Sequence, residues 1–181
     1  GDGNYKFLLD VGLTNDADND QPLDLAIDWR DTEYMSVRGY VMIGRGDDWQ
    51  AVPGQASGSV TTVRLTVPPG EWRLSLQPTY DPERFQADRA KAVAGGLSER
   101  VVGSSFYGRE IVALAAGPAD APAIFVTSRF HPYETAGSFC ASAILELLAE
   151  DLAAGGPLTR RFRFVIVPMP NPDGVALGCP K

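Results

Sequence analysis

The only histidine of this 181-residue chain, His131, lies three residues before Glu134 in the segment SRFHPYETAG, residues 128–137. An imidazole and a carboxylate at this spacing can bind one metal ion, and zinc is the natural metal for such a pair. A simpler interpretation also fits the motif: His131 hydrogen-bonds near a helix start, and Glu134 interacts favourably with the helix dipole. The local motif leaves both interpretations open.

The segments around this motif predict a strand, a helix and a second strand. Apolar runs occupy residues 121–130 and 161–170. Between them, residues 135–152 place apolar side chains on one helical stripe. Continuous apolar strands joined through a helix are typical of a parallel sheet that is covered on both faces.

This arrangement would bring two loops to one edge of the sheet. Because the crossover between parallel strands is right-handed, both strands point the same way, and the segments that follow them leave at the same edge. One segment carries His131 and Glu134, and the other, PNPDG, carries Asn171 and Asp173. If the strands are neighbours, one imidazole and two carboxylates meet in a cleft.

The first 80 residues show a different pattern, in which apolar and polar side chains alternate. This alternation is typical of antiparallel strands with one face toward solvent. Five segments follow it or are further strand candidates: residues 5–11, 23–29, 36–43, 61–67 and 71–77. Turn-forming residues separate the segments. We therefore expect an antiparallel β-sandwich over residues 1–80.

A helix is predicted over residues 81–96, between the sandwich and the apolar half. Asp81 is a plausible N-cap, Pro82 fits the first turn, and two glycines end the segment. We expect this helix to connect the sandwich to an α/β domain over residues 97–181. The predicted fold class is thus α/β, with an N-terminal antiparallel β-sandwich before an α/β sheet domain.

Composition and charge argue against several classes of protein. The formal net charge is −7, and no basic run interrupts the acidity, so nucleic acid and anionic membranes are poor partners. No apolar stretch reaches the length of a bilayer. The two cysteines form no disulfide framework, and Cys140 is expected to be buried. These features favour a reducing, cytoplasmic location.

Three segments resemble the first half of the zinc carboxypeptidases, the M14 metallopeptidases. They are FYGREIVALAAG, SRFHPYETAGSF and FRFVIVPMPNPDGVALG. The H-P-x-E-T motif behind a β-sandwich is similar to that of the cytosolic carboxypeptidase branch. The resemblance covers residues 104–178.

The resemblance implies a zinc-dependent hydrolase that removes C-terminal residues, with a peptide or protein C-terminus as its substrate. It implies His131 and Glu134 as zinc ligands and Asp173 as the carboxylate bonded to His131. Arg129, Tyr133 and Asn171 stay outside the predicted site, because local ion pairing, packing and turn formation explain them.

The sequence also departs from that family. The family's third zinc ligand is a second histidine downstream of N-P-D-G, and its substrate-binding arginine and catalytic glutamate also lie downstream. This chain has one histidine and ends at Lys181. We therefore expect the first part of a truncated catalytic domain, with no catalytic residue within the chain. It should be inactive alone, bind zinc weakly or not at all, and associate with itself through an exposed sheet edge.

Two alternatives remain beside the peptidase. The chain could be a non-catalytic binding or assembly module, as the missing third ligand suggests. It could also be related to the deacylases of N-acyl amino acids, which also use H-x-x-E with a later histidine. The NPDG segment and the preceding sandwich favour the peptidase over the deacylase.

Overall fold

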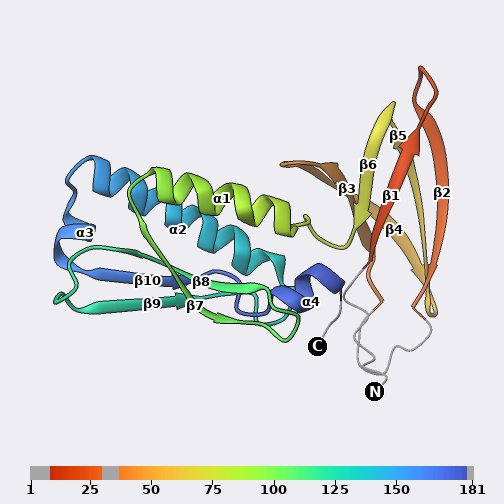
Figure 1. The fold of residues 1–181 in the computed structure, drawn as a ribbon. Helices are drawn as coiled ribbons and strands as arrows, with labels where there is room; N and C mark the ends of the chain where they lie inside the picture. The colour runs from red at the N-terminus through yellow and green to blue at the C-terminus, as the bar shows by residue number, and fades with distance from the viewer. Residues whose placement is uncertain (1–8, 30–36, 179–181) are drawn as a thin grey trace. The chain divides into compact units, whose positions relative to one another are not determined.

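A computed structural model describes residues 9–29 and 37–178, and the chain divides into two compact units between Thr79 and Tyr80. Each unit has a sheet and a core of its own (Figure 1). Most of the strand predicted over residues 5–11 lies outside the described residues, as does the first residue of the strand predicted over 36–43.

The first unit is a six-stranded antiparallel sheet. Its strands are β1 (Asp10–Asn15), β2 (Gln21–Asp28), β3 (Tyr40–Arg45), β4 (Asp48–Ser57), β5 (Val60–Val67) and β6 (Gly70–Ser75). They lie in the order β1-β6-β3-β4-β5-β2. The long strand β4 pairs with β3 through residues 48–53 and with β5 through residues 54–57. It therefore joins the two halves of a nearly closed sheet.

Alternating side chains fill the space between those halves, as the sequence pattern predicts. Val41 of β3, Val63 and Leu65 of β5, and Leu74 of β6 are almost fully buried in one cluster. In β2, Leu23, Leu25 and Ile27 are partly buried and pack against this cluster, and the residues between them are exposed. The predicted β-sandwich is confirmed, with β4 shared by both of its layers.

The second unit packs helices against a four-stranded sheet. Its elements are α1 (Pro82–Ala94), β7 (Ser98–Ser104), β8 (Glu110–Ala116), β9 (Ala123–Thr127), α2 (Thr135–Ala153), α3 (Pro157–Arg161), β10 (Arg163–Val167) and α4 (Pro172–Leu177). The strand order is β7-β8-β10-β9. The predicted strand–helix–strand unit is present, because β9 and β10 are parallel neighbours with α2 between them in the chain.

The expectation of a wholly parallel sheet is wrong. Strand β8 pairs antiparallel with both β7 and β10. Strand β7 forms a hairpin with β8 and was not predicted, because all seven of its residues are exposed and no apolar run marks it. Nor are both faces covered within the described residues: Phe125 of β9 is 65% exposed on the face opposite Val126, which packs into the core.

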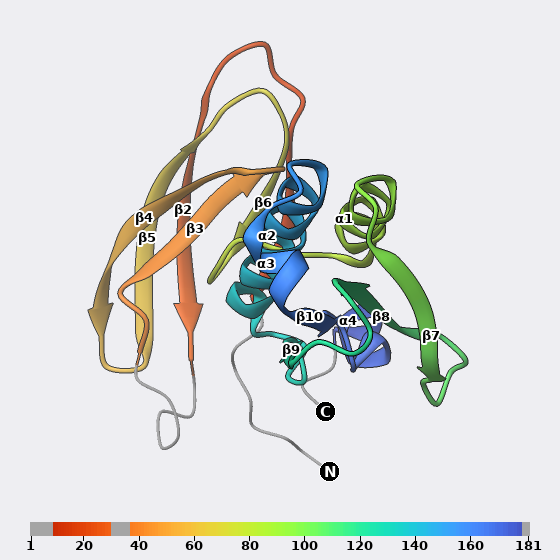
Figure 2. The ribbon, with the colours of Figure 1, turned by 90° about the vertical axis from the view of Figure 1, so that its left-hand side faces the viewer.

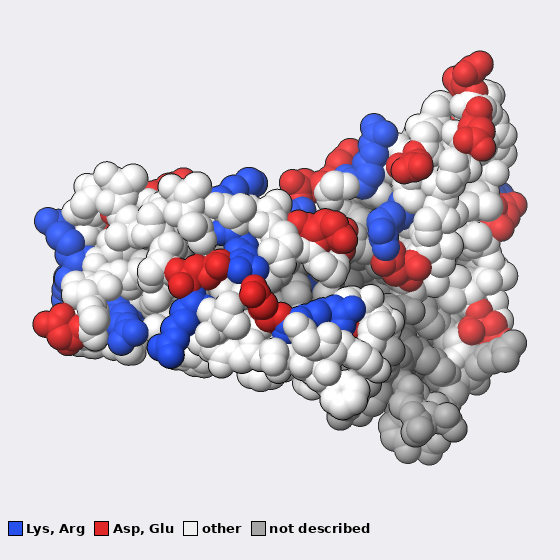
Figure 3. Space-filling model, in the orientation of Figure 1, with Lys and Arg blue, Asp and Glu red and all other residues white. Residues whose placement is uncertain are grey.

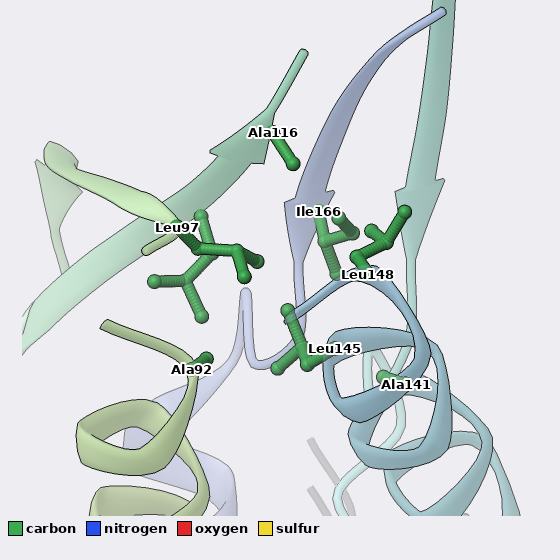
Figure 4. Close-up of a cluster of buried hydrophobic side chains, with 8 residues drawn as sticks. Ala92, Leu97, Ala116, Ala141, Leu145, Leu148 and Ile166 are labelled. Atoms are coloured by element: carbon green, nitrogen blue, oxygen red, sulfur yellow. The ribbon is translucent and has the colours of Figure 1, made fainter. Parts of the chain in front are cut away.

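The core of this unit lies between the sheet and two helices. The helices α1 and α2 lie side by side on one face of the sheet (Figure 1 and Figure 2). Figure 4 shows Leu145 and Leu148 of α2 directed toward Ile166 of β10 and Leu97. These are positions of the predicted apolar stripe. The predicted N-cap of α1 is also confirmed, since the Asp81 side chain accepts a hydrogen bond from the Arg84 amide.

The described surface is mixed in charge. On the face that Figure 3 shows, acidic and basic side chains are interspersed over both units. No helix in the described ranges is long and apolar enough to cross a membrane. Cys140, which was expected to be buried, is exposed on α2.

Candidate metal centre

His131 and Glu134 lie in one loop between β9 and α2, which we call the HPYE loop, residues 128–134. Strand β9 ends at Thr127 and α2 begins at Thr135. Glu134 occupies the N-cap position of α2, but its side chain makes no capping hydrogen bond. Instead, its Oε1 atom lies 3.0 Å from Nδ1 of His131. This contact is the hydrogen bond near a helix start that the simpler interpretation describes, and it also brings the two predicted zinc ligands together.

The His131–Glu134 pair is accessible. The two side chains are 47% and 54% exposed. The imidazole stacks on the ring of Tyr133, with 5.7 Å between the ring centroids and 8° between the ring planes. This contact and the bond to Glu134 orient the ring, while both side chains stay about half exposed.

Three consecutive carbonyl groups of the HPYE loop each accept a hydrogen bond from a different donor. The Phe130 oxygen accepts from Nδ2 of Asn171 at 3.1 Å, and the His131 oxygen accepts from the Glu134 amide at 3.1 Å. The Pro132 oxygen accepts from Nε of Arg129 at 2.6 Å. A loop with its carbonyls held in this way has few alternative conformations.

The segment that follows β10 supports the loop from one side, as its predicted place on the same sheet edge requires. Asn171 caps α4, because its Oδ1 atom accepts from the Gly174 amide at 3.0 Å. Gly174 packs so closely on Pro132 that an added Cβ would overlap Cγ of the proline. The prediction that these two loops meet is confirmed. Two residues of this segment could have indicated the contact in the sequence. Asn171 can cap α4 with its oxygen and still donate from its amide nitrogen to Phe130, and Gly174 has no side chain to displace Pro132.

Asp173 has partners other than the one predicted. Its carboxylate accepts hydrogen bonds from the Ser105 hydroxyl at 2.8 Å, the Tyr107 amide at 3.0 Å and Nη1 of Arg109 at 2.6 Å. All three donors lie in the turn between β7 and β8. From its position in the first turn of α4, Asp173 binds the turn between β7 and β8. The predicted bond to His131 is not among its contacts.

We expect Asp173→Asn to loosen the turn between β7 and β8 in a pH-dependent way. Desolvation raises the pKa of the Asp173 carboxyl, but hydrogen bonds from Tyr107, Arg109 and Ser105 outweigh it and hold the pKa below its ordinary value. A carboxylate with a depressed pKa stabilises the fold above its unfolded pKa of about 4, and this stabilisation is lost as pH falls through the folded pKa.

Urea unfolding of both proteins between pH 2 and pH 7 checks this expectation. The variant should be less stable than the unsubstituted protein at pH 7, and the difference should shrink toward zero in acid. A difference that stays constant over the whole range would show that the charge of Asp173 contributes nothing.

Arg129 is the residue that sequence reasoning missed. It is 6% exposed, and besides Pro132 it contacts Ser138 of α2, with Nη1 2.9 Å from the hydroxyl oxygen. Its guanidinium lies 5.9 Å from the ring centroid of Tyr80. Burial lowers the pKa of Arg129 to about 10, so the side chain remains charged at neutral pH. Its hydrogen-bond acceptors are two neutral oxygens, and the negative charge of Asp81 also favours the protonated side chain.

Comparison with known families shows which family the chain belongs to. The family model for zinc carboxypeptidases, peptidase M14, matches residues 88–179, slightly more than half of the chain. The chain belongs to the zinc carboxypeptidase family. The matched range contains the HPYE loop, α2, β10 and α4, the elements that build the candidate site.

Two curated zinc carboxypeptidase relatives match shorter stretches. Cytosolic carboxypeptidase 2 of Danio rerio is 38% identical over 85 residues, which are 45% of this chain and 12% of that protein. Cytosolic carboxypeptidase 1 of Xenopus laevis is 47% identical over 57 residues, which are 32% of this chain and 5% of that protein. The chain therefore aligns with only a small part of each of these relatives.

Solved structures of the family share the fold. A metallo-carboxypeptidase from Burkholderia cenocepacia superposes with a TM-score of 0.80 and 20% identity, covering 96% of this chain and 49% of that chain. A metallo-carboxypeptidase from Pseudomonas aeruginosa, in complex with (2-guanidinoethylmercapto)succinic acid, gives 0.77 and 22%, covering 96% of this chain and 48% of that chain. The chain spans about half the length of these structures.

The donor atoms of the HPYE loop fit part of the zinc site that the family name implies. Two ligand atoms on a tetrahedral zinc, each about 2.0–2.2 Å from the metal, lie about 3.4 Å apart. His131 Nδ1 and Glu134 Oε1 are 3.0 Å apart, so a small opening of the pair suffices. Among the described residues, no group of three or more His, Cys, Asp or Glu side chains could hold a metal ion. The fit is that of two ligands.

Proposed function

We propose that this chain provides His131 and Glu134 as two zinc ligands of a carboxypeptidase, whose complete form hydrolyses the C-terminal peptide bond of peptides or proteins. The observation that carries the proposal is the close approach of Nδ1 and Oε1, within a loop that the family model covers. Nothing in the described residues favours the non-catalytic module or the deacylase.

The residues of this chain would hold the metal and orient its ligands. A bound zinc ion would supply Lewis-acid chemistry, polarising a water molecule and the substrate carbonyl. Glu134 contributes a negative charge, and the loop contacts of Asn171 and Arg129 hold the imidazole beside it.

Two ligands also set the expected strength of binding. The chain contains one histidine, whereas catalytic zinc sites use three protein ligands. We therefore propose that the chain by itself binds zinc weakly and has no peptidase activity. In this proposal the third ligand, the general base and the group that binds the substrate's carboxylate come from outside the described residues.

A zinc titration by calorimetry tests the proposal. The unsubstituted chain should bind one zinc ion weakly, and His131→Ala and Glu134→Gln should each abolish the measured binding. Glu146→Gln is a matched control, since Glu146 is an exposed glutamate on α2 outside the loop. Zinc binding that survives His131→Ala unchanged would rule out the proposed site.

A cytosolic location is proposed from the names of the relatives, which are cytosolic carboxypeptidases. Fractionation of cells that express the chain with a fluorescent tag would test this location. Recovery of the tagged chain in the membrane fraction would contradict it. Self-association through an exposed sheet edge stays a prediction.

A further inference from the structure

Arg129 has the most unusual backbone conformation in the HPYE loop. Its φ angle is 59°, and no other non-glycine residue in the described part of the chain has a positive φ. The left-handed conformation is unfavourable for an L-residue, because it brings Cβ too close to a neighbouring carbonyl oxygen. A strained backbone of this kind persists only where the surrounding structure fixes it, and such residues concentrate at functional sites.

The side chain of Arg129 connects the two ends of the loop. Its Nε donates to the Pro132 carbonyl and its Nη1 donates to the Ser138 hydroxyl in the first turn of α2. The first contact closes a ring of four residues that contains His131. The second ties this ring to the helix that begins directly after Glu134. A planar guanidinium can serve two acceptors in fixed directions, which a lysine ammonium cannot do in the same way.

Burial of this cation has to be offset by its contacts. Arg129 is 6% exposed and Ser138 is 1% exposed. Removing a charged group from water is costly unless hydrogen bonds and electrostatic contacts replace the lost hydration. Here two neutral oxygens accept hydrogen bonds, and the face of Tyr80 and the negative charge of Asp81 add electrostatic stabilisation. The arrangement is therefore expensive to build, and a loop that needed only to connect β9 to α2 would not require it.

We propose that Arg129 is a positioning residue, which sets the separation of His131 Nδ1 and Glu134 Oε1 by fixing the turn of the loop and its exit into α2. The relation to zinc binding rests on the proposed function. The effect on the geometry of the pair does not, because the contact of Nδ1 with Oε1 is one between two side chains of this chain.

The test uses the single histidine as a reporter. In metal-free protein labelled with nitrogen-15, the ring signals of His131 report its contact with Glu134, and no other imidazole overlaps them. Arg129→Lys keeps the positive charge but loses the fork, and Ser138→Ala removes one acceptor. Ser142→Ala is the matched control, because Ser142 is also buried, lies one turn further along α2 and bonds to Asp88 at 2.7 Å.

We expect Arg129→Lys and Ser138→Ala to shift the His131 ring signals, and Arg129→Lys to weaken zinc binding about tenfold or more, the effect typical of lost outer contacts at a metal site. Ser142→Ala should lower stability in urea without moving the ring signals. If Arg129→Lys does not fold, Ser138→Ala decides the question alone.

Unshifted ring signals in every folded variant of Arg129 and Ser138 would overturn the inference, as would an equal shift in Ser142→Ala. Failure of the proposed function gives a different result. In that case the unsubstituted chain binds no zinc, while the ring signals still respond to Arg129→Lys.

Discussion

Gly117→Ala is expected to destabilise the second unit by about 2–5 kcal/mol, which is a large part of the total stability of an ordinary domain. Gly117 follows β8 with a φ angle of 91°, a conformation that costs alanine about 1–2 kcal/mol. An added Cβ would also overlap the Phe162 carbonyl oxygen and lie 3.1 Å from the Thr159 oxygen. Both are backbone atoms at the junction of α3 and β10, so β8 and β10 would have to move apart, at a further cost of about 1–3 kcal/mol or more.

Gly108→Ala separates the two contributions. Gly108 has a φ angle of 78° in the turn between β7 and β8, and an added Cβ there meets nothing within 4 Å. This control should lose only the cost of the backbone conformation. Urea unfolding of both variants gives the difference, and equal losses would show that the contact with Phe162 relaxes freely.

Gly174→Ala is expected to damage the candidate site directly, with a loss of about 2–4 kcal/mol in the free energy of unfolding. Alanine in the helix α4 would gain about 1 kcal/mol in helix propensity. Against this, its Cβ would overlap Pro132 and lie 2.9 Å from Nδ2 of Asn171. Overpacking costs about 1–3 kcal/mol, and displacing Asn171 would weaken its hydrogen bonds to Phe130 and Gly174, which are worth about 0.5–1.5 kcal/mol each.

The same variant should bind zinc more weakly, because the HPYE loop would be pushed away from α4. Gly12→Ala is the control, since Gly12 is an exposed residue of β1 and its added Cβ meets nothing within 4 Å. It should be neutral or slightly stabilised and keep its zinc affinity. A Gly174→Ala protein with unchanged stability and zinc binding would show that α4 does not support the loop.

The parts of the fold that the sequence predicted are those fixed by local patterns. The alternation in β2 and β5, the apolar stripe of α2 and the N-cap Asp81 each depend on residues close together in the chain. The proximity of His131 and Glu134 is local in the same way. The meeting of the two loops followed from one general rule about parallel crossovers.

The unpredicted parts depend on contacts between distant residues. Strand β7 is exposed throughout and is recognised only through its pairing with β8. Asp173 could face either the HPYE loop or the turn between β7 and β8, and that turn lies more than 60 residues away in the chain. For Arg129, a carboxylate partner was the reasonable expectation, since charges are seldom buried without one. Its actual acceptors, a carbonyl and a hydroxyl, leave no mark in the sequence.

The parallel pairing of β9 with β10 has a consequence for how the molecule folds. The contact between Asn171 and the Phe130 carbonyl spans 41 residues, so it can form only after the intervening helices have closed a long loop, which is slow compared with forming a hairpin. We expect the imidazole of residue 131 to reach its final environment late during refolding. A stopped-flow refolding experiment with a fluorescent dye attached close to residue 131 would measure the rate at which this environment forms.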